Sequence, residues 1–197
     1  MDEKSEEGMT YDMLLCGVGG QGSLSVAVLI ARAAMASGLS VKQSEVHGMA
    51  QRGGEVLAHL RISDSTIESP TIPLGCADLI LAFEPLEALR YLPWLSRESG
   101  AIVAASSPVK NIPDYPELES VLAELGSLPR TRIVDAEGIA RAAGNPRSAN
   151  VVLVGAASRL IPVPAESIER EIAEFFARKG EELVRINVKA FQDGRNS

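Results

Sequence analysis

The amino-acid sequence predicts an α/β fold with three layers, built on a mostly parallel, Rossmann-like sheet and ending in helices. Three observations support this prediction. Short apolar runs typical of strands alternate with helical periodicities over the first two thirds of the chain. The first apolar run ends in a glycine turn that opens a helix, as in nucleotide-binding folds. The last third has the apolar spacing of packed helices.

The N-terminal part is predicted to contain three strands and one helix. Residues 11–16 form a short apolar run typical of a buried strand, and a helix is expected over residues 21–37, closed by Gly38. A second strand is expected over residues 40–46. Residues 55–63 alternate between two faces, and because no helix precedes them we expect this third strand to pair antiparallel with a neighbour.

The middle of the chain predicts three more strands and two helices. The strands are expected over residues 78–83, 101–106 and 131–136. A short helix is expected after the first of these, over residues 84–92. A longer helix is expected over residues 116–125, with proline in its first turn and Gly126 just past its end.

The C-terminal third predicts a helical end to the domain. Residues 150–161 are apolar on nearly every side, which is typical of a buried helix. A helix with one apolar face is expected over residues 165–179, ending at Gly180, and a final helix from Glu181 to about Phe191.

Length and charge limit the domain organisation and the partners. The chain has 197 residues, enough for one domain with its own core. We expect a single domain over residues 10–194, preceded by an acidic, disordered tail over residues 1–9. The formal net charge of −7 gives no attraction for a phosphate polymer, so we expect no nucleic acid as a partner.

The cysteines and the apolar runs predict a cytoplasmic protein. Cys16 and Cys76 are the two cysteines and lack C-x-x-C spacing, which is typical of a reducing compartment. The N-terminus is acidic and lacks the apolar core of a signal peptide. No apolar run is long enough to span a bilayer, so we expect no membrane contact.

The first glycine turn follows the first predicted strand and comprises Gly17, Gly19, Gly20, Gln21 and Gly22. Its G-x-G-x-x-G spacing is typical of a turn that holds the pyrophosphate of NAD or FAD at a helix N-terminus. Glu45 lies near the place of the ribose-binding acid, but a glycine loop follows it instead of a second crossover helix. Three interpretations stay open: a tight connection only, a dinucleotide site, or a site for another ligand or a subunit.

A second glycine loop separates the second and third predicted strands. It comprises His47, Gly48, Gln51, Arg52, Gly53 and Gly54. We expect the first two strands to be adjacent and parallel, so that both glycine segments lie at the carboxyl edge of the sheet, where ligands of α/β folds bind. His47 can exchange a proton near neutrality, and Arg52 can bind a carboxylate or phosphate. A structural role for His47 and a surface position for Arg52 are the alternatives.

Three blocks occur in order along the chain: CGVGGQG, SEVHGMAQRGGEV and INVKAFQDG. Together they resemble the gamma-type domain of the thiamine-diphosphate-dependent 2-oxoacid:ferredoxin oxidoreductases, over residues 11–194. The middle block is most similar to the beta subunits of the indolepyruvate branch. Asn187, Ala190 and Phe191 match the C-terminal helix of the family. Glu55 and Ser23 depart from the family pattern, which leaves the substrate preference open.

The resemblance implies an oxidoreductase that decarboxylates a 2-oxoacid, here an aryl pyruvate such as indolepyruvate, to an acyl-CoA and passes electrons to ferredoxin. Thiamine diphosphate, magnesium and iron–sulfur clusters are expected in a large alpha subunit. This chain has no Gly-Asp-Gly turn and only two cysteines, and it is therefore expected to carry no cofactor. It is then a subunit of a heteromeric complex that is not active alone.

The resemblance also implies a role for the two glycine segments. They are expected to face the alpha subunit and to close over the 2-oxoacid or the coenzyme A. Arg52 and His47 would contact one of these ligands, and Gln21 would orient the second loop. The alternatives are a free-standing oxidoreductase that binds NAD or FAD, and a docking domain without a catalytic role.

Overall fold

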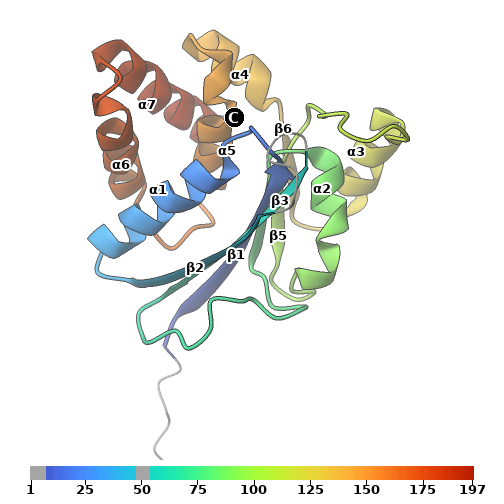
Figure 1. The fold of residues 1–197 in the computed structure, drawn as a ribbon, viewed down its shortest axis with the longest axis horizontal. Coiled ribbons are helices and arrows are strands. Elements are labelled where there is room, and N and C mark those ends of the chain that lie inside the picture. Colours follow the sequence, from blue (N-terminus) through green and yellow to red (C-terminus); the bar gives the residue numbers. More distant parts are fainter. Residues whose placement is uncertain (1–7, 48–53) are drawn as a thin grey trace, which may run out of the picture.

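The computed structural model describes residues 8–47 and 54–197, which form three layers around one sheet (Figure 1). The strands in this part of the chain are β1 (Thr10–Val18), β2 (Ser40–His47), β3 (Glu55–Ser63), β4 (Leu79–Ala82), β5 (Ala101–Ala105) and β6 (Thr131–Val134). The helices are α1 (Ser23–Ala36), α2 (Pro85–Arg90), α3 (Leu118–Ser127), α4 (Ala136–Ala143), α5 (Ala149–Ala157), α6 (Ala165–Ala177) and α7 (Glu181–Asn196). Two 3-10 turns, η1 (Leu92–Trp94) and η2 (Pro146–Ser148), connect them. The predicted fold class is confirmed.

The sheet has the strand order β2-β3-β1-β4-β5-β6. Strands β1, β4, β5 and β6 are parallel, whereas β3 is antiparallel to both of its neighbours, β1 and β2. The antiparallel third strand is therefore confirmed. The expectation that the first two strands are neighbours was wrong, because β3 lies between them. No crossover helix separates β2 from β3, so the chain can only return as an antiparallel neighbour.

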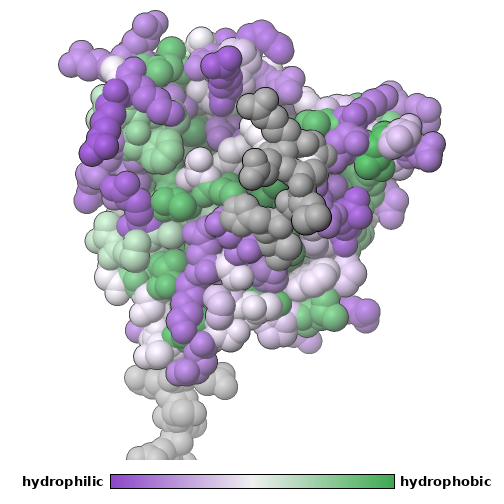
Figure 2. All heavy atoms as spheres, in the orientation of Figure 1, coloured by the Kyte–Doolittle hydropathy of each residue, from purple (hydrophilic) through white to green (hydrophobic). Residues whose placement is uncertain are grey.

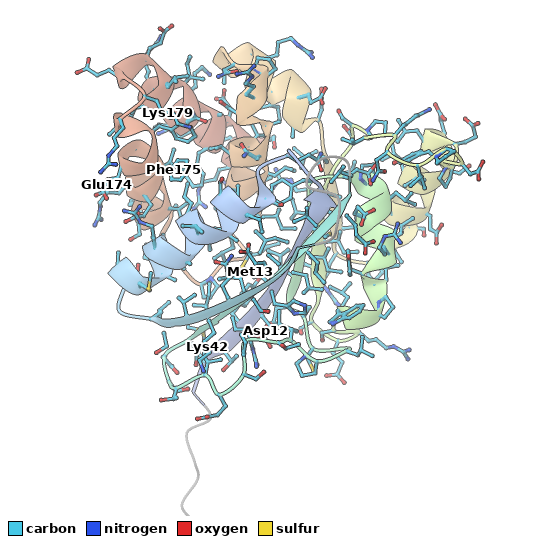
Figure 3. All side chains as sticks on the ribbon, in the orientation of Figure 1. Asp12, Met13, Lys42, Glu174, Phe175 and Lys179 are labelled. Carbon is cyan, nitrogen blue, oxygen red and sulfur yellow. The ribbon has the colours of Figure 1, made fainter. Side chains whose placement is uncertain are left out.

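Helices cover both faces of the sheet (Figure 1). Helices α1, α4, α5, α6 and α7 lie on one face, and α2 and α3 lie on the other. Successive residues of β1 alternate between these two cores, because side chains alternate along a strand. Met13 lies beneath α1 (Figure 3), and Leu14 packs with the core of α2 and α3. The sheet is thus buried on both faces at its centre.

Two helices differ from the prediction. Helix α3 begins at Leu118, so Pro116 precedes the helix and Gly126 lies inside its last turn. Helix α4 was not predicted at all. Its signals are present in the sequence, because the Asp135 side chain accepts a hydrogen bond from the Gly138 amide and Gly144 ends the helix with a φ of 118°.

Helices α5 and α7 pack backbone against backbone. A Cβ atom at Gly155 would lie 2.0 Å from the Phe191 carbonyl oxygen, and one at Gly194 would lie 2.1 Å from the Val152 carbonyl oxygen. This contact buries Asn187 and Phe191 on α7, which continues past the predicted end to Asn196. The C-terminal block of the sequence is therefore the element that closes the helical layer.

Two further findings concern the expected N-terminal tail and the search for membrane-spanning helices. Residues 1–7 of the expected tail lie outside the described residues. The carbonyl oxygen of Met9 accepts hydrogen bonds from the Asp64 amide and from the Ser63 hydroxyl. Among residues 8–47 and 54–197, none of the helices has the length and apolarity to cross a bilayer.

Candidate functional site

The two glycine segments meet at the carboxyl edge of β1. The backbone amide of Gly19 donates a hydrogen bond of 2.8 Å to the carbonyl oxygen of Gly54. Directly beside this bond, Val18 at the end of β1 pairs with Glu55 at the start of β3. The first turn therefore contacts the end of the second loop, even though β1 and β2 are not neighbours.

The structure describes the second loop only at its two ends, His47 and Gly54. Gly48, Gln51, Arg52 and Gly53 lie outside the described residues. His47 is described by its backbone alone, as the last residue of β2, where it pairs with Val56. The expected contacts of His47 and Arg52 with a substrate therefore stay predictions.

The Gln21 side chain lies inside the first glycine turn. Its Oε1 atom accepts a 2.7 Å hydrogen bond from the Val18 amide, and its Nε2 atom donates a 2.6 Å bond to the Phe83 carbonyl oxygen. These bonds join the end of β1 to the residue that follows β4. A Cβ atom at Gly17 would lie 2.7 Å from the Gln21 Oε1 atom, so the glycine makes room for this amide.

This arrangement differs from a dinucleotide-binding turn. Such a turn leaves its interior and its N–H groups open to the pyrophosphate. Here the Gln21 amide fills the interior and occupies the Val18 N–H group. In addition, β3 separates β1 from the strand that carries Glu45, so that acid lies too far along the sheet edge to serve a ligand at the first turn.

Helix α5 approaches the end of the first turn. Gly22 has a φ of 80°, in the left-handed region that favours glycine. A Cβ atom at Gly22 would lie 2.5 Å from the Nδ2 atom of Asn150. Gly22 therefore lets Asn150, in the first turn of α5, lie against the start of α1.

A cavity of about 400 Å³ opens at this edge, next to the first turn. It is bounded by the residues that follow β4, β5 and β6 and by the starts of α4 and α5. Its polar side chains are Gln21, Ser107, Glu137, Arg147 and Asn150. Neither Glu137 nor Arg147 forms an ion pair with any described residue. A cavity with an unpaired guanidinium and two amides suits a small ligand that carries a carboxylate or phosphate.

The sequence reasoning missed four of these polar cavity residues: Ser107, in the loop after β5, and Glu137, Arg147 and Asn150. The last three lie in or next to α4, η2 or the start of α5, in the stretch where no helix had been predicted before residue 150. The Asn145 side chain accepts a hydrogen bond of 3.0 Å from the Arg147 amide, which starts the η2 turn. An asparagine followed by proline is a signal for such a turn and could have indicated it.

Buried acidic groups lie behind this edge, on the side of α2. Glu84 accepts a 2.9 Å hydrogen bond from the Glu87 amide and another from the Tyr115 hydroxyl. Burial raises the pKa of Glu87, and the nearby Arg90 guanidinium partly offsets this by lowering it. Arg90 Nε lies 3.1 Å from the Glu87 carboxylate and 3.4 Å from that of Glu55. Glu55, which departs from the family pattern, thus has a charged partner on α2.

The cysteines do not fit an iron–sulfur cluster. Cys16 is fully buried in β1, and burial together with Glu87 and Glu84 raises its thiol pKa well above the usual range. Cys76 is exposed at another place in the fold. Cluster ligands are thiolates in groups of four, so neither thiol meets the requirement. In the part of the chain that the structure describes, no group of three or more His, Cys, Asp or Glu side chains could hold a metal ion.

Comparison with protein families decides the assignment. The family model for pyruvate ferredoxin/flavodoxin oxidoreductase matches residues 12–197. The chain belongs to this family. The resemblance seen in the three sequence blocks is thereby confirmed.

Curated relatives in the family are subunits of 2-oxoacid oxidoreductases. The indolepyruvate oxidoreductase subunit IorB of Methanothermobacter thermautotrophicus is 41% identical over 94% of this chain and 96% of its own length. The IorB subunit of Archaeoglobus fulgidus is 40% identical, over 95% of both chains. The 2-oxoglutarate synthase subunit KorC of the same organism is 29% identical, over 91% of this chain and 83% of its own. The predicted enzyme class, an oxidoreductase subunit of this family, is confirmed.

Solved structures share the fold. The gamma subunit of a keto/oxoacid ferredoxin oxidoreductase from Geobacter sulfurreducens has a TM-score of 0.69 at 26% identity, over 94% of this chain and 96% of that chain. A 2-oxoglutarate:ferredoxin oxidoreductase from Magnetococcus marinus, with 2-oxoglutarate, coenzyme A and succinyl-CoA bound, has a TM-score of 0.75 at 21% identity. The match covers 95% of this chain but only 30% of that longer chain.

Proposed function

We propose that this chain is the cofactor-free subunit of a cytoplasmic, thiamine-diphosphate-dependent 2-oxoacid:ferredoxin oxidoreductase. The complex would decarboxylate aryl pyruvates oxidatively to acyl-CoA and pass the electrons to ferredoxin. A large alpha subunit would hold thiamine diphosphate, magnesium and the iron–sulfur clusters. The residues of this chain support placing the cofactors in the alpha subunit, because the chain has no Gly-Asp-Gly turn and its two cysteines lie in different parts of the fold.

The hydrogen bond between Gly19 and Gly54 carries the proposal for the role of this chain. It joins the two glycine segments into one surface beside the 400 Å³ cavity at the carboxyl edge of the sheet. In the proposed complex this surface faces the alpha subunit and closes over the 2-oxoacid or the coenzyme A, which excludes water from the reaction. Arg52 and His47 would contact the ligand, since both belong to the loop that Gly54 ends.

The role proposed for Gln21 is to keep the first glycine turn, which forms part of this surface, in a fixed position. Its two hydrogen bonds fix the end of β1 against the residue after β4. A rigid first turn keeps Gly19 in position to bond Gly54. Gln21 would thereby orient the second loop through the backbone and without touching the substrate.

The relatives support the proposed ligands. Within Archaeoglobus fulgidus, the indolepyruvate subunit is 40% identical to this chain and the 2-oxoglutarate subunit 29% identical, which favours an aryl pyruvate. The Magnetococcus marinus enzyme contains a 2-oxoacid and coenzyme A, which supports both as ligands of the complex.

The experiment that tests this function is kinetics of the reconstituted complex with variants of Arg52. Losing a charge-assisted hydrogen bond costs about 1.5–3 kcal/mol, so Arg52→Ala is expected to lower kcat/KM for phenylpyruvate or for coenzyme A about 10- to 100-fold. Arg159→Ala is the matched control, because Arg159 is exposed and makes no side-chain bond to a described residue. If Arg52→Ala left kcat and both KM values unchanged, the role of Arg52 would be wrong.

The two alternatives have separate tests. A free-standing NAD- or FAD-binding oxidoreductase would bind NADH or FAD in a titration of the purified chain, with a Kd in the micromolar range (on the order of 1–100 μM). The Gln21 amide inside the turn argues against this alternative. A docking domain without a catalytic role would leave turnover of the alpha subunit unchanged when this chain is absent.

A further inference from the structure

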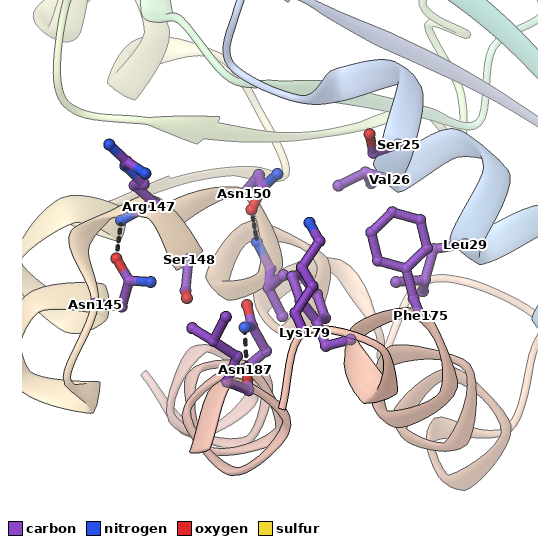
Figure 4. A pocket seen from close by; sticks show the side chains of 13 residues that line it. Ser25, Val26, Leu29, Asn145, Arg147, Ser148, Asn150, Phe175, Lys179 and Asn187 are labelled. Atoms are coloured by element: carbon purple, nitrogen blue, oxygen red, sulfur yellow. Dashed lines mark hydrogen bonds between the residues drawn. The ribbon is translucent and has the colours of Figure 1, made fainter. Parts of the chain in front are cut away.

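A second cavity, of about 380 Å³, lies between α1, α5, α6 and α7 (Figure 4). Arg147 and Asn150 line both this cavity and the one at the sheet edge, so the two cavities adjoin. Of the described residues that the sequence singled out for ligand binding, none lines it.

One wall of this cavity is apolar. Val26 and Leu29 of α1 face Phe175 of α6 (Figure 4). The rings of Phe175 and Phe176 pack edge to face, with centroids 5.1 Å apart and an interplanar angle of 72°. Figure 2 shows apolar side chains in the region between α1 and the C-terminal helices, framed by hydrophilic ones. This wall can accept a planar, ring-sized apolar group.

Two cations at the cavity lack acidic partners. The Lys179 ammonium lies 5.6 Å from the Phe175 ring centroid and 5.2 Å from that of Phe176 (Figure 3). Ring faces attract the ammonium without neutralising its charge, so Lys179 stays available to an anion. Neither Lys179 nor Arg147 forms an ion pair with a described residue.

Two uncharged polar groups at the cavity also lack partners. Ser148 is only 2% exposed, and its Oγ atom has no hydrogen-bond partner among the described residues. A buried hydroxyl without a partner costs free energy. The Asn150 amide nitrogen donates no bond to any described residue, and Figure 4 shows the Lys179 ammonium pointing toward Asn150.

We propose that this cavity binds a small carboxylate that carries an aromatic ring. The carboxylate would lie against Lys179 and Asn150, and the ring would pack on Phe175 and Leu29. An anion without a ring would leave the apolar wall exposed, and a neutral ring would leave both cations unpaired. The ligand is of the same chemical class as the proposed aryl pyruvate substrate, but the inference rests on the cavity lining alone.

Calorimetric titration of the full-length chain tests this site. Indole-3-acetate is expected to bind in a one-to-one ratio, at least about ten times more tightly than indole or acetate, because only it has both the ring and the charge. Lys179→Met is expected to weaken this binding at least about tenfold. Lys189→Met is the matched control, since Lys189 is an exposed lysine of α7 paired with Asp193, and it is expected to change nothing.

A second variant separates binding from folding. Asn150→Ala removes an amide nitrogen that donates no bond to any described residue, so the free chain is expected to keep a Tm close to that of the wild type while its affinity for indole-3-acetate falls. Equal affinities of the wild type and Lys179→Met, equal binding of indole and indole-3-acetate, or binding of coenzyme A alone would each overturn the proposal.

The site can be tested apart from the proposed function. Arg52→Ala, which tests the loop in the complex, is expected to leave binding of indole-3-acetate to the chain unchanged. If Arg52→Ala abolished this binding, the ligand would lie at the second loop and the location inferred here would be wrong. A failure of turnover in the complex would leave the titration result unaffected.

Discussion

The amide of Gly19 donates a 2.8 Å hydrogen bond to the carbonyl oxygen of Gly54, and this bond holds the first glycine turn and the end of the second glycine loop together. The bond forms because β3, which follows the second loop, lies between β1 and β2. The end of the second loop therefore lies beside the first turn. Changes that displace the first turn are therefore expected to reach the second loop through the backbone.

Gln21→Ala is expected to destabilise the chain by about 1–3 kcal/mol, because it removes two hydrogen bonds at the end of β1. Gln21→Glu should cost at least as much, because a carboxylate oxygen in place of Nε2 would face the Phe83 carbonyl oxygen and two acceptors repel each other. Urea denaturation of the purified chain measures both. A midpoint equal to that of the wild type for Gln21→Glu would contradict the hydrogen bond to Phe83.

Gly17→Ala is expected to destabilise the chain by about 1–3 kcal/mol, because the added Cβ atom would lie 2.7 Å from Gln21 Oε1 and 3.0 Å from Phe83 Cβ. The cost should be smaller in a Gln21→Ala background, since one of the two overlaps is then absent. Gly126→Ala is the control: it lies inside α3, where an added Cβ atom would meet only Ile133 Cδ1 in ordinary contact at 3.9 Å, and it should stabilise by about 0.5–1 kcal/mol. Equal costs of Gly17→Ala in both backgrounds would show that the two residues do not interact.

Gly155→Ala is expected to be the most damaging single methyl group, at about 3 kcal/mol or more, because the Cβ atom would lie 2.0 Å from the Phe191 carbonyl oxygen. A backbone atom cannot move aside without shifting the whole of α7. Thermal unfolding followed by circular dichroism measures the loss. A Tm within the error of the wild type would mean that α5 and α7 are farther apart.

The His59 pKa is expected to lie below its ordinary value of about 6.5. Burial lowers the His59 pKa, and Asp12 only partly raises it again. Its Nδ1 atom accepts a 3.1 Å hydrogen bond from the Ile72 amide, which requires the neutral ring. An NMR titration, with His59→Gln to assign the signal, measures this pKa directly, and a value at or above about 6.5 would contradict the prediction.

The same shift gives the chain a pH-dependent stability. As the pH falls, His59 takes up a proton at a higher pH in the unfolded state than in the folded state. Its contribution to the free energy of unfolding is therefore complete above about pH 6.5 and is lost as the pH falls toward the folded pKa. Glu87 has the opposite effect, since its raised pKa adds stability as the pH falls. Comparing urea midpoints of the wild type and His59→Gln at pH 7 and at lower pH isolates the His59 contribution, because Glu87 is present in both proteins.

Local sequence patterns predicted most of the fold. The alternation in residues 55–63 and the lack of a preceding helix were enough to predict an antiparallel third strand. The position of that strand between β1 and β2 could not be predicted, because the order of strands depends on packing between segments that are distant in sequence. Helix α4 was missed because it is only eight residues long and Ile139 is its one large apolar residue.

The candidate site was predictable only where its residues form a motif. The glycine segments stand out in the sequence because glycine marks turns and close approaches. Arg147 and Asn150, which are close in sequence, and Lys179, which lies farther along the chain, belong to no motif. They line one cavity with α1 only once α5, α6 and α7 pack over it, and no local sequence pattern records that packing.

The most direct test of the proposed function is reconstitution of the complex with and without this chain. Reduction of ferredoxin by the purified alpha subunit, with phenylpyruvate and coenzyme A, is the quantity to measure. We expect turnover only when this chain is added, and a lower rate when it carries Arg52→Ala. An alpha subunit that reduces ferredoxin at the same rate without this chain would contradict the proposal that the two glycine segments complete the site.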